Sequence, residues 1–126
     1  MNTILWILAG VLALVFLMAG LMKIAQPKAK LAESGMGWVE NYSAGAVKAI
    51  GGVEILAAIG LILPALLGIA PVLVPLAALG LVLVMLGAVV VHGKRKETPM
   101  IGVNIVLLVL AAVVAWGRFG PYSLSA

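Results

Sequence analysis

The chain has 126 residues, of which 65% are hydrophobic, and its formal net charge is +4 at pH 7. Soluble domains contain about 45–50% apolar residues, so this composition excludes an ordinary soluble protein and indicates a polytopic membrane protein. The basic residues lie in short segments between apolar runs and do not indicate nucleic-acid binding. The absence of cysteine excludes disulfides, thiol redox chemistry and cysteine-ligated clusters.

Four apolar runs approach the length of about 20 residues that a helix needs to cross a bilayer. They predict transmembrane helices over about 3–23, 45–63, 71–91 and 99–117. We therefore expect an all-α fold, an antiparallel bundle of four transmembrane helices that forms one domain over residues 1–126. The first run has no basic residue before it and is longer than the apolar region of a signal peptide, so we expect it to be retained.

The segment 24–44 is the only long loop between these runs. Its charged first part predicts a short surface helix over 28–34. Trp38 and Tyr42, four residues apart, are typical of an aromatic anchor pair at a membrane interface. Loops of this length are either functional or mobile, and the sequence leaves the role of this one open.

Proline residues mark the boundary between the two central helices. Pro64 predicts that the second helix stops there, and the uncharged segment 64–70 predicts a tight antiparallel hairpin. Pro71 suits the first turn of the third helix. Pro75 lies one turn further along and predicts a slight kink.

The basic residues are distributed unevenly between the two sides of the predicted bundle. One side has only Arg118, and the other has Lys23, Lys28, Lys30, Lys48, Lys94, Arg95 and Lys96. Because positive residues stay preferentially in the cytoplasm, we expect both termini to face away from it. We expect the membrane to be a bacterial inner membrane.

Glu54 is the only acidic residue inside any of the long apolar runs. A charge at the centre of a membrane helix costs roughly 2.5–3.5 kcal/mol on the translocon scale. Gly51, Ala57 and Ala58 lie next to Glu54 at helical spacing, and small residues allow a second helix to come close. Glu54 is therefore expected to face a helix–helix contact or a pocket and not the lipid.

A rise of 1.5 Å per residue brings one polar residue from each helix to the cytoplasmic half of the bilayer. These residues are Lys23, Glu54, His92 and Asn104. Arg118 lies at the other end of the last helix, on the same stripe as Asn104. All five are candidate ligand-binding residues.

Each candidate also has a structural interpretation. Lys23 fits a snorkelling lysine at a helix end, His92 fits an interfacial residue, and Arg118 fits a membrane-end anchor. Asn104 is of a type that forms hydrogen bonds between helices. Glu54 fits a structural partner for Lys23 or Asn104.

A carboxylate near a lysine and a histidine can hold a quinone head group, relay a proton or bind a cation. One histidine and one acidic residue are too few for a structural zinc site, and no second histidine exists for bis-histidine haem ligation. A quinone is therefore the candidate cofactor that these arguments leave. The sequence assigns no catalytic residue and does not decide whether the protein is an enzyme.

The same residues lie within a longer series of spaced motifs. The series is Phe16-x3-Gly20-x2-Lys23, Gly51-x2-Glu54, Leu63-Pro64, Met85-x-Gly87-Ala88-x3-His92, Asn104 and Gly117-Arg118. In these motifs the chain resembles the DoxX-like family of small four-helix membrane proteins. Relatives include the small membrane subunit of a thiosulfate:quinone oxidoreductase, and others are linked to oxidative-stress complexes. The resemblance implies a membrane partner that binds a quinone or docks a redox enzyme, with any other electron-transfer cofactor supplied by that enzyme.

Three functions stay open at this point. The first is a quinone-associated or redox-enzyme-docking subunit with a polar cluster around Glu54. The second is a small proton-coupled transporter that works as a homo-oligomer, since small multidrug exporters also have four helices and one intramembrane glutamate. Their glutamate lies in the first helix, however, and the asymmetric charge of this chain argues against dual topology. The third is a non-catalytic scaffold or assembly protein.

Overall fold

The computed structural model describes residues 1–33 and 37–124, and these residues form helices and connecting turns with no strand. The elements are α1 (Asn2–Ala25), α2 (Lys28–Glu33), the 3-10 helix η1 (Gly37–Asn41), α3 (Ala44–Leu67), α4 (Leu73–Lys94) and α5 (Thr98–Phe119). Helices α1, α3, α4 and α5 are long and apolar enough to cross a membrane. The predicted all-α, four-span membrane fold is therefore confirmed.

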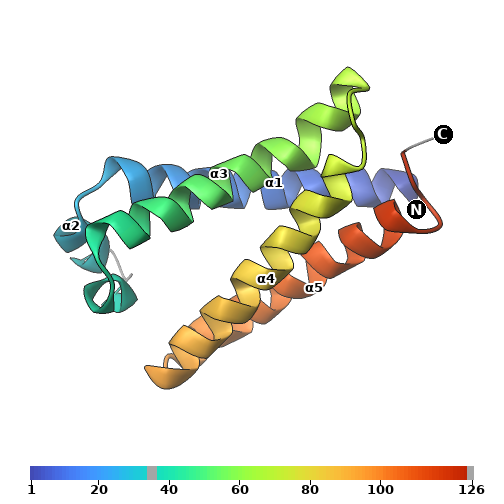
Figure 1. The fold of residues 1–126 in the computed structure, drawn as a ribbon. Coiled ribbons are helices and arrows are strands. Elements are labelled where there is room, and N and C mark those ends of the chain that lie inside the picture. The colour runs from blue at the N-terminus through green and yellow to red at the C-terminus, as the bar shows by residue number, and fades with distance from the viewer. Residues whose placement is uncertain (34–36, 125–126) are drawn as a thin grey trace.

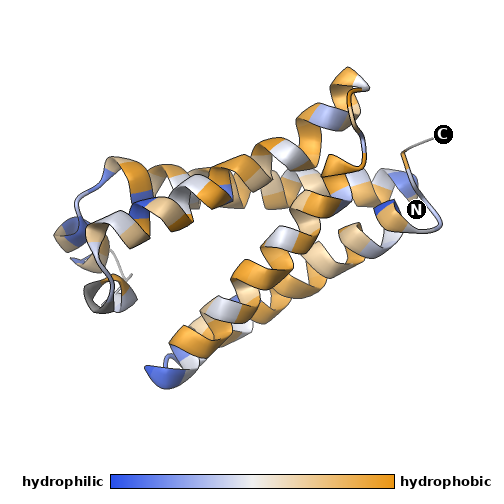
Figure 2. Ribbon diagram, in the orientation of Figure 1, coloured by the Kyte–Doolittle hydropathy of each residue, from blue (hydrophilic) through white to orange (hydrophobic). Residues whose placement is uncertain are grey.

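The four long helices form two antiparallel pairs, α1 with α3 and α4 with α5 (Figure 1). The pairs meet near the end that holds both termini and the α3–α4 turn, which we call the terminal end. They diverge towards the end that holds α2, η1 and the α4–α5 loop, which we call the basic end. Figure 2 shows hydrophilic residues gathered on α2 and on the α4–α5 loop, while the long helices are mainly apolar.

Within the first pair, α1 and α3 cross at two glycines. A Cβ atom on Gly20 would lie 2.6 Å from the Gly51 carbonyl oxygen, and one on Gly51 would lie 2.8 Å from the Gly20 carbonyl oxygen. No side chain fits between the two backbones at this crossing. Small residues allow close approach of membrane helices, so the pair is held by direct backbone packing.

The two pairs contact each other through small residues nearer the terminal end. A Cβ atom on Gly60 of α3 would lie 3.0 Å from the Cβ atom of Ala77 on α4. On the other side of the bundle, the Leu5 side chain of α1 occupies the space beside Gly117 of α5. These contacts bring the pairs together at one end only, which leaves space between them towards the basic end.

The boundary between α3 and α4 differs from the expected one. Helix α3 continues through Pro64 to Leu67 and is capped by Gly68, whose φ of 66° is the left-handed conformation that glycine adopts without strain. Membrane helices tolerate an internal proline because neighbouring groups and local adjustment satisfy the freed backbone groups. Pro75 lies in the first turn of α4, where a missing N–H interrupts no helical hydrogen bond.

The loop 24–44 is built on a small apolar cluster of its own. Leu31 of α2, Val39 of η1 and Val47 of α3 are all buried together. The expected surface helix appears as α2, and Ser34 at its expected end lies outside the described residues. The cluster fixes η1 over the basic end of the first helix pair.

Candidate ligand cavity

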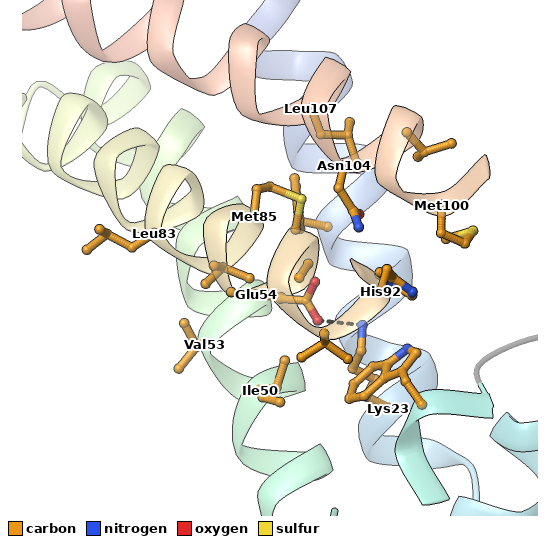
Figure 3. Close-up of a pocket in the computed structure, with 18 of the residues that line it drawn as sticks. Lys23, Ile50, Val53, Glu54, Leu83, Met85, His92, Met100, Asn104 and Leu107 are labelled. Atoms are coloured by element: carbon orange, nitrogen blue, oxygen red, sulfur yellow. Dashed lines mark hydrogen bonds and ion pairs between the residues drawn. The ribbon is translucent and has the colours of Figure 1, made fainter. Parts of the chain in front are cut away.

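A cavity of about 580 Å³ lies in the part of the bundle nearer the basic end. All four long helices contribute to its lining (Figure 3). Trp38 of η1 and Tyr42, which follows η1, line it as well. Small-molecule sites in proteins have volumes of about 300–1,000 Å³. The cavity therefore has the size of a ligand site, and it lies between the diverging helix pairs.

Lys23 and Glu54 form an ion pair in this cavity. The Nζ atom of Lys23 lies 2.7 Å from Oε1 of Glu54, and the two residues are only 7% and 3% exposed. The Lys23 ammonium also lies 5.8 Å from the centre of the Trp38 ring, within cation–π range. The expected contact of Glu54 with another helix is therefore present, and Lys23 points into the bundle.

His92 enters the cavity lining from α4 and is also buried. Its Nδ1 atom lies 2.9 Å from Oε1 of Glu97, which also accepts a hydrogen bond from Nε of Arg95 at 3.1 Å. The hydrogen bond from His92 lowers the pKa of the Glu97 carboxyl, and the charge of Arg95 lowers it further. An ionised carboxylate only accepts hydrogen bonds, so His92 donates from Nδ1.

Sequence reasoning did not find Glu97. It stands between Lys96 and the start of α5, at the end of a run of basic residues. The turn after α4 carries Glu97 back towards His92, and the backbone N–H of Glu97 donates to the carbonyl of His92. The only sequence feature that indicates this contact is the five-residue spacing of His92 and Glu97 across the end of α4.

Asn104 lines the cavity from α5 and is 5% exposed. Figure 3 shows its side chain pointing into the space that Glu54 and His92 also face. Its Nδ2 atom is buried and has no hydrogen-bond partner in the part of the chain that the structure describes. The structural interpretation of Asn104 was a hydrogen bond to another helix. The Nδ2 atom does not form such a bond.

Arg118 lies at the terminal end, away from the other four candidates. Its Nη1 atom donates to Oδ1 of Asn2 and to the Tyr122 carbonyl oxygen, and its guanidinium lies 5.9 Å from the centre of the Trp6 ring. It does not line the cavity. The structure thus brings together Lys23, Glu54, His92 and Asn104 and leaves Arg118 as a link between the two ends of the chain.

The cavity has an apolar rim that reaches the outer surface of the helices. Val53 of α3, Leu83 of α4 and Val103 of α5 all line it and are 50%, 62% and 50% exposed. In a bilayer these residues contact lipid tails. The cavity therefore has a lateral connection to the hydrocarbon region.

Trp38 of η1 and the adjacent Tyr42 lie over the basic end of the cavity. The rings of Trp38 and Tyr42 contact each other edge to face at 5.8 Å, and both line the cavity. A Cβ atom on Gly37 would lie 2.9 Å from a guanidinium nitrogen of Arg95, so η1 reaches the α4–α5 loop. The long loop thereby bridges the two helix pairs where they diverge.

The profile of the DoxX-like family matches residues 7–114. The chain belongs to the DoxX-like family. No curated protein and no solved structure matches it. The matched stretch of this DoxX-like protein contains all four polar residues of the cavity, whereas Arg118 lies beyond it.

Proposed function

We propose that this DoxX-like protein is a membrane subunit that binds a quinone head group in the cavity between its helix pairs. The observation that carries the proposal is a cavity of ligand size that combines a buried polar cluster with a rim exposed to lipid. A quinone has a polar head group and an apolar tail. Such a molecule reaches the cavity from the bilayer without passing through water.

The residues of the cavity have separate tasks in this proposal. Asn104 and Lys23 donate hydrogen bonds to the quinone oxygens, and Glu54 holds the Lys23 ammonium in place. His92 is oriented by Glu97, so that its other ring nitrogen is available to the ligand. The apolar rim accommodates the tail.

A bound quinone supplies the electron-accepting chemistry, and a redox enzyme that docks on the membrane supplies the electrons. The basic end is the docking side in this proposal, because η1 and the α4–α5 loop lie there next to the cavity. In this proposal the basic end faces the cytoplasm, an orientation that the positive residues of α2 and of the α4–α5 loop favour under the positive-inside rule.

Mass spectrometry of small molecules extracted from the detergent-purified protein tests the proposal. We expect a quinone enriched in the wild-type protein and depleted from Glu54→Gln. Glu33→Gln is the matched control, because Glu33 lies on α2 and does not line the cavity. The double variant Lys23→Gln/Glu54→Gln removes both charges, so loss of the quinone there is not due to an unpaired buried lysine.

A second pair of variants tests the cavity itself. A Cβ atom on Gly87, which lines the cavity, or on Gly102, which does not, meets no atom within 4 Å. We expect Gly87→Leu to fill the opening and reduce the bound quinone, and Gly102→Leu to leave it unchanged. Equal quinone content in all variants, or none in the wild type, would contradict the proposal.

The Lys23–Glu54 pair also favours a second function, that of a non-catalytic scaffold. Each charge has the other as its partner, so the pair can serve α1–α3 assembly without any ligand. In that case Glu54→Gln weakens folding or partner binding, and no small molecule is enriched in either protein. The same extraction experiment therefore separates the two functions.

A further inference from the structure

The charged groups and the histidine that line the cavity already have partners. Lys23 and Glu54 lie 2.7 Å apart, and the His92 side chain is bonded to Glu97, which also binds Arg95. No other lysine, arginine or acidic residue lines the cavity among the described residues. A negatively charged head group would find no unpaired cation there, and a positively charged one would find no unpaired anion.

Asn104 is the exception in this balanced environment. Asn104 lines the same space, and its Nδ2 atom is buried and has no partner among the described residues. An unpaired buried donor is unfavourable, because it has lost its hydrogen bonds with water and gained none in the protein. A ligand that brings a hydrogen-bond acceptor to Asn104 removes this penalty.

We propose that the cavity selects an uncharged head group whose carbonyl oxygen accepts a hydrogen bond from Nδ2 of Asn104. Ketones, quinones and esters with an apolar tail belong to this class, whereas carboxylates and quaternary ammonium ions do not. The inference rests on the ligand cavity of the proposed function and goes further, because it defines what the cavity rejects. It does not require that the ligand is a quinone.

Three probes with saturated tails of similar length and different head groups test the selection. They are 2-dodecanone, dodecanoate and dodecyltrimethylammonium, each added at the same mole fraction to lipid nanodiscs that contain the protein. A ligand that binds only the folded protein raises its melting temperature. We expect 2-dodecanone to raise the melting temperature of the wild-type protein and the two charged probes to leave it unchanged.

Variants of Asn104 show which atom is responsible. Asn104→Leu fills the site without a donor, and Asn104→Ala leaves space without a donor. We expect both to bind 2-dodecanone about tenfold more weakly, the usual effect of losing one hydrogen bond. We also expect the ligand-free Asn104→Leu protein to melt at a higher temperature than the wild type, because its unpaired donor is gone.

Two outcomes would overturn the inference. One is a larger stabilisation by dodecanoate or dodecyltrimethylammonium than by 2-dodecanone. The other is wild-type affinity for 2-dodecanone in both Asn104 variants, together with a lower melting temperature of ligand-free Asn104→Leu, which indicates a structural role for the amide. Stabilisation by 2-dodecanone without any co-purified quinone would reject the quinone and keep the selection by Asn104.

Discussion

Gly20 and Gly51 contact each other across the α1–α3 crossing, and each stands three residues before one member of the buried ion pair. Lys23 therefore lies nearly one turn after the first glycine, and Glu54 nearly one turn after the second. Because the backbones touch at the glycines, the two side chains need to span only a short gap. The crossing thus sets the distance between the ammonium and the carboxylate.

A side chain at this crossing should separate the two helices. We expect Gly51→Ala to destabilise the protein by about 1–3 kcal/mol, the usual effect of overpacking a close contact, and to lengthen the Lys23–Glu54 distance. Gly52→Ala is the control, because a Cβ atom there meets nothing within 4 Å. Unfolding in mixed detergent measures both effects on stability, and equal stability of the two variants would show that the crossing tolerates a methyl group.

Removing one member of the ion pair should be more harmful than removing both. Loss of one partner from a buried pair leaves an uncompensated charge and costs about 3–5 kcal/mol. We therefore expect Glu54→Gln to unfold much more readily than the double variant Lys23→Met/Glu54→Gln. A double-mutant cycle measures the coupling between the two residues, and additive effects would show that they do not interact.

The Glu97 carboxyl should make stability depend on pH. The hydrogen bond from His92 and the charge of Arg95 lower its pKa from the ordinary value of 4.5. Such a group contributes stability above its unfolded-state pKa, and this contribution is lost as the pH falls through the folded-state pKa. We expect Glu97→Gln to have a lower melting temperature than wild type at pH 7.

Melting curves recorded from pH 7 down to pH 3 measure this effect. The difference between wild type and Glu97→Gln should shrink as the pH falls below about 4.5, whereas the control Glu33→Gln should follow the wild type throughout. A difference that stays constant over the whole range would show that the charge of Glu97 is not responsible.

Arg118 should affect the terminal end and leave ligand binding unchanged. Arg118→Lys keeps the charge but loses the guanidinium that bonds Asn2 and the Tyr122 carbonyl. We expect a destabilisation of about 1–3 kcal/mol, typical of hydrogen bonds to a charged group, with the wild-type amount of co-purified small molecule. Loss of that molecule in Arg118→Lys would instead support the expectation that Arg118 belongs to the ligand site.

The sequence predicts the depth of the polar residues along the bundle, but it predicts little about how the helices are arranged side by side. Lys23, Glu54, His92 and Asn104 were expected at one level of the bundle, since a helix has a fixed rise per residue. The divergence of the two helix pairs was not predictable. Membrane helices that are apolar on all sides give no periodic signal for the face that contacts a neighbour.

The remaining differences have similar causes. Glu97 meets His92 through the geometry of a turn, and Trp38 meets Lys23 through the packing of η1, neither of which follows from residue spacing. Pro64 was expected to end α3, but the helix continues to Leu67 because one lost backbone bond does not outweigh the many that remain. In each case, tertiary contacts decided a position that local sequence left open.

The close pairing of Lys23 with Glu54 has a consequence for the response to membrane voltage. Moving one elementary charge across a membrane potential of 100 mV changes its energy by about 2.3 kcal/mol. The two opposite charges lie at nearly the same depth, so the field exerts almost no net force on the pair. If the ligand is uncharged, its entry moves no charge through the field. Occupancy of the cavity should therefore be the same in energised and de-energised membranes.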